Sequence, residues 1–154
     1  MASERSGSGL MPEGLASMAV CLEAPCVPGE MEQWATGVRD ALLHARQFVR
    51  ARVATNHHEH YRGIAEEDTE MFRQVANLMK EDRRLESALE TLHQRASRLA
   101  ETAARLEPDE GRLRDELKSL QHDGLEFLIQ WQQQEAALRT WLQEAFNRDR
   151  GVGD

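Results

Sequence analysis

The 154-residue chain is long enough for one domain with a well-buried core. Its helix-favouring residues dominate after position 30 while Gly and Pro gather near the ends, so no β-sheet is expected. With 27 acidic against 19 basic residues, the net charge of −8 would repel phosphate backbones, and no segment approaches the roughly 20 apolar residues that cross a bilayer. We therefore expect an all-α cytoplasmic protein with no nucleic-acid and no membrane partner.

Residues 1–29 carry Ser, Gly and Pro without sustained periodicity, which predicts a disordered or loosely attached tail. Cys21 and Cys26 lie within it, and two cysteines cannot complete a four-cysteine zinc site, so we expect them to be unpaired. Pro28 and Gly29 then punctuate the chain before the first long periodic segment.

The first predicted helix spans residues 31–53, where apolar residues from Met31 to Phe48 recur at steps of three and four. Arg52 occupies the next position of that apolar seam. The His-rich segment 56–63 interrupts the pattern and is interpreted as a solvated loop. A second, shorter helix is predicted over residues 64–79.

The third predicted helix, residues 85–106, has the most regular seam, in which mostly leucines alternate at four and three residues. Pro108 and Gly111 end it, and a fourth helix is predicted over residues 113–145 with Gln134 on its seam. Residues 30–148 thus predict an up-down-up-down four-helix bundle, monomeric or homodimeric, with a flexible C-terminus over 149–154.

Several histidines and one glutamate have spacings that could serve a metal site. They are His44, His57, His58, His60, Glu90, His93 and His122. Each has a plainer interpretation: a boundary histidine at 44, a solvated loop at 57–60, and surface charges elsewhere, because these last positions flank the seams. No serine lies in a strand-turn-helix setting and no glycine-rich phosphate loop occurs, so no enzymatic activity is predicted.

The C-terminal run from Leu142 to Asp154, with its Asp149-x-Gly151-x-x-Asp154 spacing, resembles the end of small bacterial hemerythrin-like (HHE cation-binding) proteins. The segment 84–92 before Ala96 and the helix from Trp34 to Val53 are similar in spacing. The resemblance implies a four-helix bundle that holds two irons through inward histidines and carboxylates.

The same resemblance places the family's histidine positions on Arg52, Ala96 and Gln134. Arginine and alanine cannot ligate iron, and glutamine is a poor substitute for imidazole, so the ligand set is degenerate and no cofactor is expected. A buried Arg52 would need a partner such as Gln134 or Glu135; alternatively it ends its helix and reaches water.

These observations favour a non-enzymatic bundle that acts as an interaction or sensory module with an unidentified protein partner. Two alternatives stay open. One is an iron- and dioxygen-binding protein that uses the seven residues named above as unconventional ligands. The other is a structural coiled coil that oligomerises through its third helix.

Overall fold

The computed structural model describes residues 11–151, with side chains described up to Arg148, and this part of the chain is helical without strands. Residues 1–10 and 152–154, which belong to the predicted tail and C-terminus, lie outside the described residues. The elements are α1 (Glu13–Glu23), α2 (Met31–Arg52), the π-helical turn η1 (Val53–His57), α3 (His58–Glu67), the 3₁₀ turn η2 (Thr69–Met71), α4 (Phe72–Ala103) and α5 (Glu110–Gly151). Within these residues, no helix combines the length and apolar character that a bilayer crossing requires.

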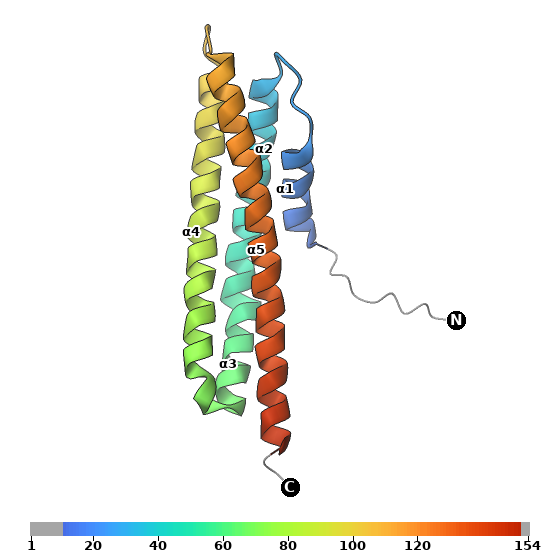
Figure 1. Ribbon diagram of the computed structural model, residues 1–154, viewed down its shortest axis with the longest axis vertical. Helices are drawn as coiled ribbons and strands as arrows, with labels where there is room; N and C mark the ends of the chain where they lie inside the picture. The colour runs from blue at the N-terminus through green and yellow to red at the C-terminus, as the bar shows by residue number, and fades with distance from the viewer. Residues whose placement is uncertain (1–10, 152–154) are drawn as a thin grey trace, which may run out of the picture.

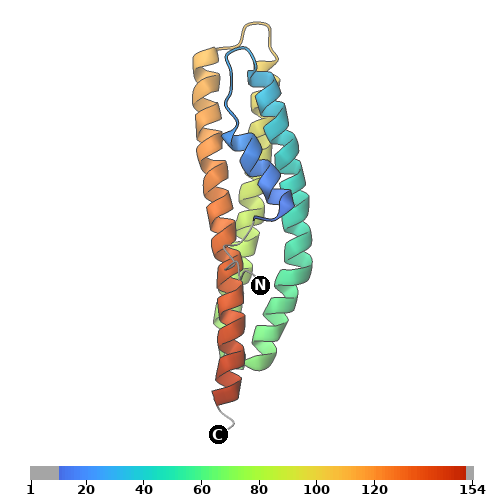
Figure 2. The same ribbon diagram turned by 90° about the vertical axis from the view of Figure 1, so that its right-hand side faces the viewer.

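Four helical rods pack side by side with alternating directions (Figures 1 and 2). Short α1 runs toward one end of the bundle, α2, η1 and α3 return as one continuous rod, and α4 and α5 follow in opposite directions. The all-α, four-helix expectation is confirmed, but the helices are divided differently. The predicted first helix continues through η1 and α3. Most of the predicted second helix joins the third as α4, and α1 supplies the remaining rod.

The predicted tail is wrong over residues 13–23, which form α1. Its Leu15, Met18 and Leu22 are buried against α2 and α5. The Trp34 indole Nε1 donates to the Ala24 carbonyl at 3.0 Å, and the Gln121 amide Nε2 donates to the Leu22 carbonyl at 2.9 Å. A helix this short is marginal alone, so its stability comes from the groove that receives it.

The predicted loop at 56–63 is also wrong, because the helix continues through it with a π turn. The step from buried Val49 to buried His57 is one residue longer than two turns of a regular seam. A π turn absorbs one extra residue, so Tyr61 and Ile64 return to the interior. At the other end of the chain, α5 continues to Gly151 through the first residues that were predicted to be flexible.

Two apolar cores follow one another along the bundle. The first contains residues of α1, α2, α4 and α5, and the second contains residues of α3, α4 and α5 together with Met71. On α4 the change falls between Leu78 and Leu85, and on α5 between Trp131 and Leu138. Asp82 and Gln134 occupy these two gaps and are buried. A polar layer therefore separates a four-helix half from a three-helix half.

The seating of α1 can be tested with two glycine substitutions. A Cβ at Gly14 would lie 2.9 Å from Phe48 Cβ and Cγ, whereas a Cβ at Gly37 would meet nothing within 4 Å. We expect Gly14→Ala to lower the free energy of unfolding by about 1–2 kcal/mol because α1 must shift. Gly37→Ala should raise it by roughly 0.5–1 kcal/mol through helix propensity. Urea unfolding measures both, and a stabilising Gly14→Ala would contradict this packing of α1.

Candidate functional site

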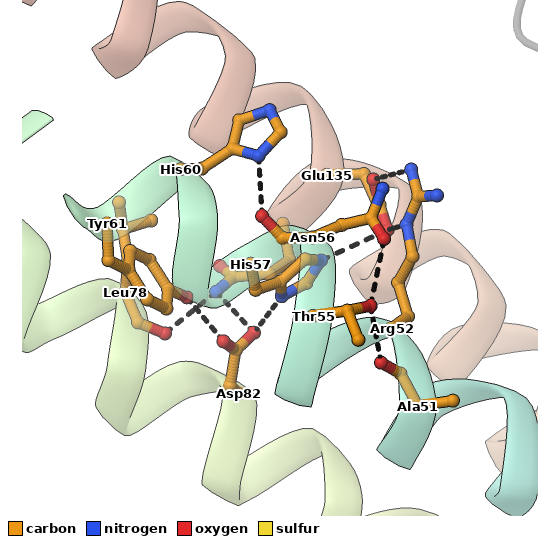
Figure 3. A network of polar contacts seen from close by, with 11 residues as sticks. Ala51, Arg52, Thr55, Asn56, His57, His60, Tyr61, Leu78, Asp82 and Glu135 are labelled. Carbon is orange, nitrogen blue, oxygen red and sulfur yellow. Dashed lines mark hydrogen bonds and ion pairs between the residues drawn. The ribbon is translucent and has the colours of Figure 1, made fainter. Parts of the chain in front are cut away.

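A buried histidine lies at the centre of the polar layer (Figure 3). His57 comes from the π turn and is 2% exposed. Its Nδ1 lies 2.9 Å from Asp82 Oδ1 and its Nε2 lies 3.1 Å from Glu135 Oε1. A ring that faces a carboxylate oxygen at each nitrogen donates from both, which is the hydrogen-bonding pattern of an imidazolium. The Trp131 ring stacks on it with centroids 5.1 Å apart and planes 15° apart.

Asp82 of α4 is the second centre of the network. Its Oδ1 accepts from His57 and from Gln134 Nε2, the latter at 2.9 Å, and its Oδ2 accepts from the Tyr61 hydroxyl. Gln134 Nε2 also donates to the Leu78 carbonyl at 2.8 Å. Asp82 is 2% exposed, so these donors replace the water that its carboxylate loses on burial.

Glu135 of α5 joins the network to Arg52 at the end of α2. Arg52 Nε lies 3.0 Å from Glu135 Oε1 and Nη2 lies 3.2 Å from Oε2, which is a bidentate ion pair. The Arg52 side chain is 34% exposed, so it pairs with Glu135 and also reaches water. Gln134, the other partner considered for Arg52, bonds to Asp82 instead.

The surroundings set the pKa values of these groups. Burial lowers the pKa of His57, but hydrogen bonds and charge from Asp82 and Glu135 outweigh burial and raise it to about 9. Burial acts on Glu135 in the opposite direction and raises its pKa, but hydrogen bonds and charge from His57 and Arg52 lower it to about 2. Burial and then Asp82 raise the pKa of the Tyr61 hydroxyl, which stays protonated as a donor. At neutral pH, two cations and two carboxylates balance one another.

Side-chain donors also cover carbonyl groups around the π turn. His60 Nδ1 lies 2.6 Å from the Asn56 carbonyl oxygen, and the Thr55 hydroxyl donates to the Ala51 carbonyl at 2.8 Å. Backbone acceptors near a widened turn are thereby paired with local side chains. His60 thus contributes to the turn, while its neighbour His58 is exposed and contacts the Tyr61 ring edge-on.

The remaining candidate residues are dispersed over the surface. His44 is exposed, Glu90 pairs with Arg46 at 2.5 Å, and His93 is half-buried. Ala96 is fully buried and contributes a methyl group to the first core.

His122 lies with Asp123 and Glu126 in the one group of three ligand-type side chains that come within 4.8 Å of one another among the described residues. The His122 side chain is 77% exposed, and Asp123 already pairs with Arg95 at 2.6 Å. The group lies on the outer face of α5, away from the polar layer.

The geometry at His57 supports an ion-pair network. The two carboxylates approach opposite edges of the imidazole ring, so neither nitrogen presents a free lone pair to a ligand. A metal ion at either nitrogen would have to displace a carboxylate from it. In place of an ion, the Arg52 guanidinium supplies positive charge to Glu135.

Asp82 and Tyr61 were not identified from the sequence, although Asp82 had a detectable signal. It stands four residues after Leu78 and three before Leu85, which is a seam position. The predicted break between residues 79 and 85 concealed it. The inward positions of Tyr61 and His57 were obscured because the π turn moves the seam by one residue, so His57 was assigned to a solvated loop.

Comparisons of this sequence and structure with protein-family models, curated proteins and solved structures found no match.

The pKa of His57 predicts how stability depends on pH. Its folded pKa of about 9 lies above the ordinary 6.5, so its stabilisation is complete below pH 6.5 and is lost as pH rises through 9. Glu135, with a folded pKa near 2, contributes above pH 4.5 and loses its contribution as pH falls toward 2. We expect the free energy of unfolding to drop by about 3 kcal/mol between pH 6.5 and pH 9.

Urea unfolding across that pH range measures the loss, and His57→Gln provides the control because its side chain does not titrate. The alkaline loss should be much smaller in this variant. Equal losses in both proteins would show that His57 is not the responsible group.

Removal of the Asp82 charge should strongly destabilise the bundle. Asp82→Asn leaves a buried imidazolium without one of its counter-charges and turns an amide N–H₂ toward established donors, which should cost about 3 kcal/mol or more. Asp115→Asn, at an exposed position of the same residue type, should change stability by less than about 0.5 kcal/mol. Thermal unfolding compares them, and matching losses would contradict the network.

Proposed function

We propose that this chain is a non-enzymatic, hemerythrin-like helical bundle that acts through its surface as an interaction or sensory module. The observation that carries the proposal is the self-compensated polar layer. Both nitrogens of buried His57 are hydrogen-bonded to carboxylates, and Arg52 covers the outer carboxylate. The interior thus has polar groups at the level where a metal bundle would hold its ions, but they satisfy one another.

The three positions that would carry metal-binding histidines support this proposal. Arg52 directs a guanidinium to Glu135, Ala96 fills the core with a methyl group, and Gln134 directs its amide N–H₂ to Asp82. Arg52 and Ala96 have no lone pair to give to a cation, and Gln134 uses its amide N–H₂ in this network. The positive charges of Arg52 and His57 neutralise the buried carboxylates in the way that a bound cation otherwise would.

Three hydroxyl groups on α4 support a non-enzymatic role. Those of Thr91, Ser97 and Thr102 donate to helix carbonyls four residues earlier, at 3.1, 3.0 and 2.8 Å. A hydroxyl nucleophile requires instead a general base within hydrogen-bond reach.

The two alternatives have less support. The seven candidate ligands are divided between the network, the π turn and several outer faces, so they do not converge on one point. A coiled coil through the third predicted helix would need its seam exposed. The seam residues of α4 from Leu85 to Leu99 are buried within this chain, where α4 packs against α2 and α5.

Metal content tests the proposal directly. We expect protein produced with added iron to contain far less than one iron per chain and to lack an oxo-bridge absorption band. About two irons per chain, as a bundle di-iron site requires, would overturn the proposal. Elemental analysis of His57→Gln in parallel is the control, since iron that is lost in this variant would place a metal at the polar layer.

A further inference from the structure

A surface hollow of about 380 Å³ lies beside the polar layer. Its walls come from the chain just before α1, the end of α2 and one face of α5. The residues that define it are Met11, Pro12, Arg52, Trp131, Gln132, Glu135 and Arg139. Its volume is within the range of roughly 300–1,000 Å³ that small-molecule sites occupy.

The charges on these walls favour an anion. Glu135 already accepts from Arg52 Nε and Nη2 and from His57 Nε2. Arg139 is exposed and has no hydrogen-bond or ion-pair partner among the described residues, and Arg52 keeps Nη1 uncommitted. Two guanidinium groups therefore have N–H donors to spare while the one wall carboxylate is occupied, although the whole chain carries −8.

The rest of the hollow favours a ligand with an apolar part. Met11, Pro12 and the Trp131 ring supply apolar surface. Trp131 is 1% exposed, and its indole Nε1 is buried without an acceptor among the described residues. Because Nε1 is buried, the indole contributes only apolar ring surface to the hollow.

We propose that this hollow binds a small organic anion, a carboxylate attached to an aromatic or short aliphatic group. The carboxylate pairs with Arg139 and the free Nη1 of Arg52, and the apolar group lies against Trp131, Met11 and Pro12. The proposal deepens, and rests on, the sensory role proposed above. Binding at Arg52 engages the same guanidinium that holds Glu135, so the ligand communicates with the His57 network.

Benzoate is the probe, and the indole Nε1–H signals in ¹H–¹⁵N NMR spectra of the full chain are the readout. Trp34→Phe and Trp141→Phe variants assign the three signals. We expect benzoate to shift the Trp131 signal with a Kd of about 1 mM, which is typical for a fragment of this size, while the Trp34 signal stays in place.

Arg139→Gln should weaken benzoate binding by about tenfold or more, since it removes the unpaired guanidinium. Arg83→Gln, another exposed helical arginine, is the matched control and should bind as the wild type does. Benzamide, a neutral molecule of nearly the same shape, should produce little shift. Circular dichroism verifies that each variant is folded.

The proposal is overturned if benzoate leaves Trp131 unshifted at ~10 mM, if benzamide binds equally well, or if Arg139→Gln binds as tightly as the wild type. Metal analysis distinguishes its failure from failure of the proposed function. If the protein is iron-free and does not bind benzoate, only the proposed anion site is contradicted. If it contains two irons and binds benzoate, the anion site stands and the proposed metal-free module is contradicted.

Discussion

A charged imidazole inside a helical bundle needs a counter-charge at each ring nitrogen, and the arrangement of this protein follows from meeting that need. Asp82 of α4 and Glu135 of α5 supply the two carboxylates. His57 reaches both because the π turn adds one residue to the rod. In a regular α-helix, the omission of that residue would rotate the following side chains by about 100°. The π turn and the ion pairs are therefore parts of one structural solution.

The network fixes the axial alignment of the rods at the level where the bundle changes from four helices to three. Apolar seams tolerate sliding, because one leucine layer resembles the next. The polar layer does not, since His57, Asp82 and Glu135 come from three different rods and any slip would leave a buried charge unpaired. The layer thereby aligns the three rods along their axes. On one side α1 fills the groove between α2 and α5, and on the other α3 packs directly against α5.

The same layer connects the interior to the surface. Glu135 and Arg52 extend from the buried imidazole to a hollow that water reaches, and Trp131 touches both His57 and that hollow. A ligand that changed the pairing of Arg52 would alter the charge facing His57. This continuity is the physical basis for the proposed sensory role, because a surface event and the packing register share the same residues.

The sequence alone determined the helical composition, the main apolar seams and the seam positions of Arg52 and Gln134, because periodicity reports which face of a helix avoids water. It did not determine which segments form the four helices, the presence of α1, or the site. Three buried residues in α1 form no periodic segment long enough to recognise, and their helix depends on a groove made by α2 and α5. A one-residue π insertion looks like a break in the pattern. The partners of His57 lie 25 and 78 residues away, so only tertiary packing could bring them to its ring.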